Sequence, residues 1–162
     1  MLDVWPTYFK CRPSYFKPSE FGKCADDERL DTRIRAGCKM DEHFIWKLEL
    51  LRCRIGRPLI VNMRGGYRNE AVNKLAGGAK NSAHRLGRAA DISTRGWEPW
   101  QRKQLVSEAR ALGITGVGIG KTFIHLDDVT KNDGPYTRPL AWTYTDSGKV
   151  AVLGKDIPDA LY

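Results

Sequence analysis

The sequence of 162 residues lacks any apolar run close to the roughly 20 residues that a membrane-spanning helix needs. Its first residues, MLDVWPTYFK, lack the basic region followed by an apolar region that marks a secretory signal peptide. Internal repeats, low-complexity tracts and blocks of five or more like charges are also missing. We therefore expect one folded domain that is synthesised in the cytoplasm without a secretion signal of its own.

Cysteine is scarce, with four residues at positions 11, 24, 38 and 53. No two of them form a CxxC pair, which argues against a zinc knuckle. Without a signal peptide we expect free thiols. Two disulfides are the alternative that the even number of cysteines allows.

Acidic residues are fewer than basic ones, 19 against 27, so the formal net charge is +8. This charge favours an anionic partner, such as nucleic acid, an anionic cell-wall polymer or a membrane surface, or it serves solubility alone. The basic residues are spread along the chain, which disfavours the nucleic-acid interpretation.

The spacing of apolar residues and chain breakers predicts helices mixed with strands. Residues 1–37 are rich in aromatic residues and proline, and we expect an irregular arm that packs on a domain of residues 38–162. Expected helices cover 42–55 after an N-cap at Asp41, 67–75 and 98–112. Expected strands cover 58–63, 89–93, 115–119, 123–129, 142–144 and 150–153, the last two forming a hairpin. This pattern indicates an α+β fold, a single domain with a mainly antiparallel sheet flanked by helices.

The chain has only three histidines, and two of them suggest a metal site. His84 lies before the expected strand 89–93, and His125 lies on the expected strand 123–129, whereas His43 reads as an ordinary helix residue. Together with Asp91, His84 and His125 offer three ligands of a tetrahedral zinc site with a fourth position left for water. Bound zinc lowers the pKa of water to roughly 7, as a hydrolase needs. The alternative is a hydrogen-bonded core histidine and an aspartate that caps a turn.

Asp127 follows His125 by two residues, so both side chains point to the same face of a strand. Its carboxylate could orient the imidazole or handle a proton. An ordinary solvated or salt-bridged aspartate is the alternative. Asp128 points to the other face, and we expect it to face solvent.

The residues SAHRLGRAAD at 82–91 match the SxHxxGxAxD signature of the D-Ala-D-Ala carboxypeptidase family of zinc peptidases, which includes phage L-Ala-D-Glu endolysins. Other segments resemble this family in the same order: YFKPSEF at 15–21, RPLIVN at 57–62, GYRN at 66–69, AGGAKNS at 76–82 and FIHLD at 123–127, followed by Arg138 and Trp142. The resemblance covers roughly residues 15–145. It implies a hedgehog/D-Ala-D-Ala peptidase-like fold.

The resemblance also implies a set of Zn²⁺ ligands: His84, Asp91 and His125. It implies Arg68 as the arginine that pairs with a substrate carboxylate or carbonyl, for which a guanidinium fork is suited. It implies that Ser82 braces the site by hydrogen bonding. Gly87, Ala89 and Ala90 would then keep the path between the ligands narrow, so that His84 and Asp91 converge on one ion.

Three departures from the family pattern affect the expected site. Thr122 stands where many relatives carry an acidic general base, and a hydroxyl cannot do that work at neutral pH. Asp127 is our substitute candidate for this catalytic role. The linker 63–65 differs from the family pattern, so we expect a reshaped loop on the substrate side. The segment 130–137 resembles an insertion before Arg138.

The resemblance implies a zinc-dependent peptidase that cleaves peptidoglycan stem peptides, as a carboxypeptidase or an endopeptidase. The missing signal peptide leads us to expect that it is encoded by a bacteriophage. It would act at the cell wall after release or as a virion component beside other virion proteins, and its basic surface would adhere to anionic wall polymer. The alternative, motivated by Thr122, is a non-catalytic virion structural or wall-binding module that retains the peptidase fold. Binding of nucleic acid rests on the net charge alone.

Overall fold

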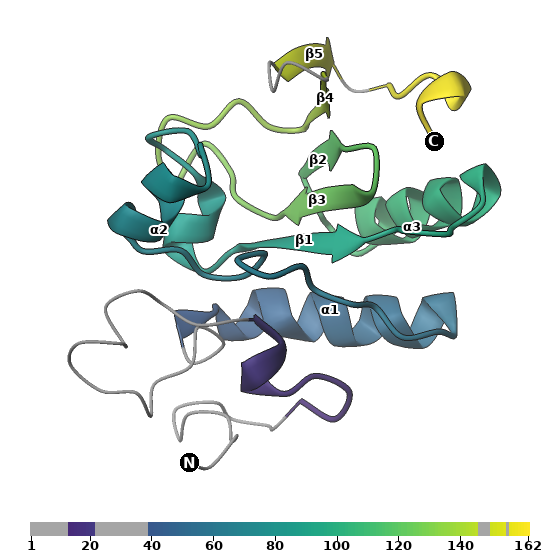
Figure 1. The fold of residues 1–162 in the computed structure, drawn as a ribbon, viewed down its shortest axis with the longest axis horizontal. Helices are drawn as coiled ribbons and strands as arrows, with labels where there is room; N and C mark the ends of the chain where they lie inside the picture. Colours follow the sequence, from purple (N-terminus) through teal and green to yellow (C-terminus); the bar gives the residue numbers. More distant parts are fainter. Residues whose placement is uncertain (1–12, 22–38, 146–149, 155) are drawn as a thin grey trace.

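The computed structural model describes residues 13–21, 39–145, 150–154 and 156–162. A five-stranded sheet organises these residues, with the order β1-β3-β2-β4-β5 (Figure 1). Its strands are Ala89–Ser93 (β1), Gly116–Ile119 (β2), Phe123–Asp127 (β3), Leu140–Tyr144 (β4) and Val150–Gly154 (β5). Strands β2 and β4 are parallel, and the other neighbouring pairs are antiparallel. The predicted α+β fold with a mainly antiparallel sheet is therefore confirmed.

The helices begin and end at the residues that their capping chemistry favours. They are Glu42–Ile55 (α1), Glu70–Leu75 (α2) and Pro99–Ala111 (α3), with short 3-10 helices at Pro18–Phe21 (η1), Ala83–Leu86 (η4) and Asp159–Leu161 (η5). The Asp41 carboxylate accepts from Phe44 N at 2.9 Å, and Gly56 ends α1 with φ 69°. Helix α2 is shorter than predicted because Asn69 caps it and accepts from Val72 N at 2.8 Å. Within the described residues, none of the helices has the length and apolar character needed to cross a membrane.

The core lies between one face of the sheet and helices α1 and α3. Alternate residues of β1, β2 and β3 point into it: Ala90, Ile92, Val117, Ile119, Ile124 and Leu126. The two helices supply the facing apolar side chains: Phe44, Ile45, Leu48, Leu51, Leu105, Val106 and Ala109. The remaining residues of β1 and β3, among them Asp91 and His125, consequently lie on the opposite face of the sheet.

The strand predicted at 58–63 is wrong, because only Val61 in this stretch forms a β-bridge, to Ile92. Asn62 N donates to Asp91 O at 2.8 Å, and Asp91 N donates to Gly65 O at 2.8 Å. Between these two bonds the chain turns sharply, with Gly65 N donating to Asn62 O at 2.7 Å. A Cβ at Gly65 would lie 2.6 Å from Asn62 O, so this turn requires glycine. The turn keeps the segment from extending along the free edge of β1.

Asp128 is buried, with 3% of its surface exposed, so our expectation that it faces solvent is wrong. Its carboxylate accepts from Lys47 Nζ at 2.7 Å and from Arg88 Nε at 2.8 Å. Arg88 also forms an ion pair with Asp133. Because side chains alternate along a strand, Asp128 does point to the opposite face of the sheet from Asp127. Helix α1 covers the face to which Asp128 points, and it supplies Lys47.

Residues 13–21 are the described part of the arm expected over 1–37, and the predicted boundary between arm and domain lies outside the described residues. In this part, Phe16 and Phe21 are buried, and their ring centroids are 5.6 Å apart. The buried carboxylate of Glu49 on α1 accepts the backbone N–H groups of Ser14, Tyr15 and Phe16 at 2.8–3.1 Å. Cys53 is a free, exposed thiol, and the other three cysteines lie outside the described residues.

We expect Glu49→Ala to lower the free energy of unfolding by about 2–4 kcal/mol, because three backbone donors lose a buried charged acceptor. Chemical denaturation would measure this change. The matched control is Glu108→Ala, which removes an exposed pair with Arg54 and should cost about 0–1 kcal/mol. Equal losses in the two variants would contradict the anchoring role of Glu49.

Candidate metal centre

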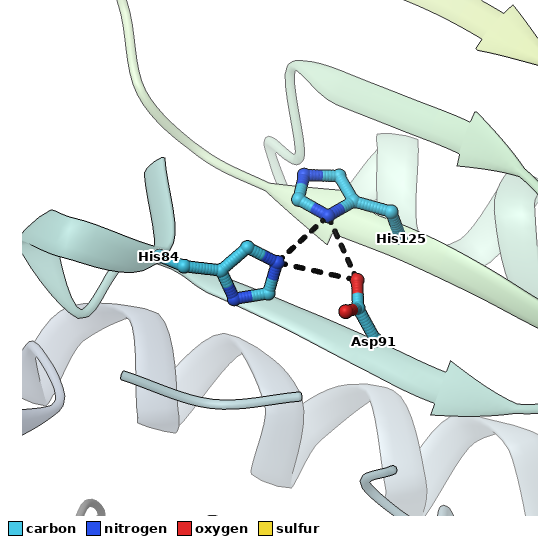
Figure 2. A group of neighbouring side chains, drawn as sticks. All are labelled: His84, Asp91 and His125. Carbon is cyan, nitrogen blue, oxygen red and sulfur yellow. Dashed lines mark hydrogen bonds and ion pairs between the residues drawn. The ribbon is translucent and has the colours of Figure 1, made fainter. Parts of the chain in front are cut away.

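Three buried side chains converge on the open face of the sheet (Figure 2). His84 comes from η4, Asp91 from β1 and His125 from β3, and the register of β1 and β3 places Asp91 directly opposite His125. His84 Nε2 lies 3.1 Å from His125 Nδ1 and 3.2 Å from Asp91 Oδ1. His125 Nδ1 lies 2.9 Å from the same Asp91 oxygen. These three atoms therefore form a compact triangle of potential ligands.

Hydrogen bonds on the outer sides of both rings determine which nitrogens face this triangle. His84 Nδ1 donates to Gly66 O at 2.8 Å, and His125 Nε2 donates to Asp127 Oδ2 at 3.0 Å. In the neutral rings the inner nitrogens then carry lone pairs, which face each other and a carboxylate oxygen. Such an arrangement requires a cation or a proton between the three atoms.

The donor set fits Zn²⁺. Two imidazole nitrogens and one carboxylate oxygen are common zinc ligands, and bonds of about 2.1 Å in tetrahedral geometry place ligand atoms about 3.4 Å apart. The observed separations of 2.9–3.2 Å need to widen by only a few tenths of an ångström to reach it. The outer hydrogen bonds of both rings match the way proteins usually orient metal-binding histidines.

The charges around the centre also favour a cation. Burial lowers the pKa of His84. Burial opposes the charge on His125 as well, but its hydrogen bonds to Asp127 and Asp91 outweigh burial and raise the pKa of His125 to about 9. Burial raises the pKa of Asp91, whereas the two neighbouring histidines act more strongly together and hold this pKa far below its usual range. Asp91 and Asp127 are therefore charged, and the raised pKa of His125 shows that the two carboxylates favour a positive charge between them.

The small residues between the ligands allow close packing of the chain. Gly87 ends η4 with φ 68°, a conformation that favours glycine. A Cβ at Gly87 would lie 2.2 Å from Lys39 O, and Gly87 O accepts from Asp41 N at 3.0 Å. Ala89 and Ala90 are fully buried. The segment from His84 to Asp91 therefore packs closely against the residues that lead into α1.

Asp127 is fully buried and connects His125 to Arg138. Besides the bond from His125, its two oxygens accept from Arg138 Nε at 3.0 Å and from Arg138 Nη2 at 2.8 Å. Burial raises the pKa of Asp127, but the bonds from His125 and Arg138 outweigh this effect and lower it. Gly116 leaves room for the carboxylate, since a Cβ there would lie 2.2 Å from Asp127 Oδ2. This geometry is suited to holding the imidazole in one orientation.

The two residues of β2 that face the open side of the sheet, Gly116 and Gly118, are both glycine. The missing side chain at Gly118 leaves room for the aromatic rings of Trp142 and Tyr144. A Cβ at Gly118 would lie 2.6 Å from Trp142 Nε1 and 2.9 Å from Tyr144 Cε2. The Trp142 ring therefore crosses β2 and lies 5.1 Å from the His125 ring, centroid to centroid. Burial is the main cause that raises the pKa of Tyr144 to about 12. Tyr144 was not predicted as a neighbour of the site, although the GVGIG spacing of β2 is a signal for side chains that cross this strand.

We expect Gly118→Ala to push the Trp142 indole away from His125, and to cost about 1–3 kcal/mol of folding stability by overpacking. Thermal unfolding and tryptophan fluorescence would detect the change. Val152→Ala is the control, since Val152 pairs with Trp142 across β4 and β5 but is 67% exposed. A stable Gly118→Ala protein with unchanged fluorescence would refute this account of β2.

A cleft of about 350 Å³ opens beside the candidate metal centre, lined by residues of 67–70, 80–86 and 133–136. Arg68 lies on its wall, forms an ion pair with Asp91 and donates from Nε to Arg64 O at 2.5 Å. Ser82 also lines the cleft; it is the N-cap of η4 but makes no side-chain capping bond. Both residues predicted to serve the substrate thus lie at the cleft.

Thr122 lies in the turn between β2 and β3, where its carbonyl accepts from Thr94 N at 2.9 Å. It brings no acidic group to the site. The segment 130–137, which the sequence analysis interpreted as an insertion, contributes Asp133, Pro135 and Tyr136 to the cleft. These cleft residues were not predicted individually, because nothing in their local sequence marks them.

Fold and site together define an α+β domain with three potential metal ligands on the open face of its sheet. Residues 14–127 match the family profile described as Peptidase M15, so the chain belongs to the Peptidase M15 family. Over 84 residues it is 34% identical to the zinc D-Ala-D-Ala carboxypeptidase of Streptomyces albus G, which covers 51% of this chain and 32% of that protein. The match thus spans about a third of the relative's length. The family resemblance read from the sequence is confirmed.

Proposed function

We propose that this protein is a zinc-dependent peptidase that hydrolyses a peptide bond in the stem peptides of peptidoglycan. The observation that carries the proposal is the convergence of His84, Asp91 and His125, whose inner nitrogens and carboxylate oxygen lie within 4.8 Å of one another. Membership of the Peptidase M15 family and the similarity to a zinc D-Ala-D-Ala carboxypeptidase support the reaction type and the substrate class.

His84, Asp91 and His125 would hold Zn²⁺, which supplies an activated water and polarises the scissile carbonyl. Asp127 holds the His125 ring through Nε2, and Arg138 holds Asp127 in turn. Arg68, at the boundary between centre and cleft, offers guanidinium N–H groups to a substrate carboxylate or carbonyl. Ser82 lies on the same cleft wall and would brace that side of the site.

The residue that moves the proton is a separate part of the proposal. The role of general base that the sequence analysis assigned to Asp127 stays a prediction. The contacts of Asp127 with His125 and Arg138 support a positioning role for it instead, because both of its oxygens are engaged and the residue is fully buried. Together with Thr122, this supports a second candidate function, a non-catalytic wall-binding or virion module that retains the fold.

A phage origin, and action at the wall after release or within a virion, belong to the same proposal. The net charge of +8 supports adhesion to anionic wall polymer in either setting.

The test is mass spectrometry of purified peptidoglycan after incubation with the protein, in matched chelated and zinc-restored samples. We expect zinc-dependent loss of a terminal alanine or a cut within the stem, and the product names the bond. Absence of product from several wall types, with zinc bound one to one, would overturn the peptidase and favour the non-catalytic module.

A further inference from the structure

The cleft beside the metal centre has an uneven balance of charge. Three cationic side chains line it, Arg68, Lys80 and Arg85, together with two acidic ones, Glu70 and Asp133. The cleft adjoins the centre, because Arg68 on its wall pairs with the ligand Asp91, and Arg85 follows the ligand His84 in η4. A substrate whose scissile bond lies at the centre would therefore extend into this cleft.

Neither acidic residue neutralises the positive charges of Lys80 and Arg85 in the cleft. Asp133 is held by Arg88 from outside the cleft lining and accepts from Thr130 N at 2.7 Å and Thr130 Oγ1 at 2.9 Å. The Glu70 side chain is 87% exposed, and its Oε2 lies 3.8 Å from Arg85 Nη2, a separation at which a surface pair contributes little.

The cations that remain are Lys80 and Arg85, and both residues line the same cleft. Arg85 Nη1 donates to Lys80 O at 2.8 Å, which fixes the guanidinium next to the residue that carries the ammonium group. Arg68 is the third cation, but it already donates to Asp91 and to Arg64 O, and its remaining N–H groups are those that the proposed function assigns to the substrate. A guanidinium and an ammonium that line the same cleft are suited to a carboxylate, which accepts two N–H bonds from the fork and one from the lysine.

We propose that Lys80 and Arg85 form a subsite for a free carboxylate of the substrate, on a residue near the scissile bond. This inference rests on the proposed function and makes it more specific: the enzyme would prefer stem peptides that carry an unmodified carboxylate over the same peptides with a carboxamide. The carboxylate comes either from an internal acidic residue or from the chain end.

The experiment uses the full zinc-loaded chain and four synthetic stem peptides, with the internal carboxylate free or amidated and the C-terminus free or amidated. We expect kcat/KM to favour the free acid by about tenfold or more in one of the two comparisons, as loss of a charged hydrogen bond predicts. Lys80→Met should bring this ratio close to 1. Arg85→Lys, which keeps the charge but loses the fork, should reduce it in part.

Lys74→Met is the matched control, because Lys74 is exposed on α2 outside the cleft lining, and it should leave the ratio unchanged. Equal rates for free and amidated peptides in the wild-type protein would overturn the subsite and leave the peptidase intact. If no peptide is cleaved, the proposed function fails, and calorimetric binding of the same four peptides decides the subsite. Preferential binding of one free acid that Lys80→Met abolishes supports it, and equal binding overturns it.

Discussion

His125→Ala should abolish stoichiometric zinc binding and lower the peptidase rate on the order of a thousandfold or more. Loss of an outer partner of a ligand costs about 10–100-fold, and loss of one of three ligands should cost more. Zinc content by elemental mass spectrometry and release of stem-peptide fragments would measure the two effects. The substitution also removes the ring that lies between Asp91 and Asp127, so zinc should no longer raise the unfolding temperature.

The chain supplies a matched control for this prediction in its third histidine. His43 is exposed on α1, away from the ligand triangle, and His43→Ala should keep full zinc content and activity. Circular dichroism would show whether His125→Ala is folded, and His84→Ala provides an independent second variant. Zinc bound one to one in both folded ligand variants would show that the triangle is not the metal site.

Asp127→Asn should lower zinc affinity by about 10–100-fold, because the His125 ring loses the charged partner that orients it. Arg138 would lose its buried carboxylate as well, and we expect a loss of about 3–5 kcal/mol in the free energy of unfolding. Competition with a chelator of known affinity would measure the first effect, and chemical denaturation would measure the second.

Asp128→Asn separates the positioning role from a general loss of stability. Asp128 is equally a buried carboxylate, but it binds Lys47 and Arg88 and makes no bond to His125. This variant should be destabilised while its zinc affinity changes less than about threefold, within the effect expected away from a ligand's own partner. If Asp127 acts as the general base, Asp127→Asn would keep its zinc affinity and lose kcat. If it positions His125, saturating zinc would restore much of the rate.

Local signals determined a large part of the fold. The strand predicted at 89–93 is β1, and the helix predicted after Asp41 ends at Gly56, because capping and periodicity act within a few residues. The strand predicted at 58–63 failed for a physical reason of longer range. Its apolar run has local strand propensity, but the turn at Gly65 and the hydrogen bonds to Asp91 keep the segment from extending along the edge of β1.

The sequence by itself determined the identity of the three potential ligands, because the SxHxxGxAxD spacing and the FIHLD strand carry them. Only the tertiary structure decided how they meet, since the register that sets Asp91 opposite His125 joins residues 34 apart in the chain. It also decided the contrasting surroundings of Asp127 and Asp128, which are neighbours in sequence. One faces His125 and Arg138 on the open side of the sheet, and the other faces Lys47 of α1. Which face of the sheet a helix covers depends on tertiary packing, and a local sequence pattern does not determine it.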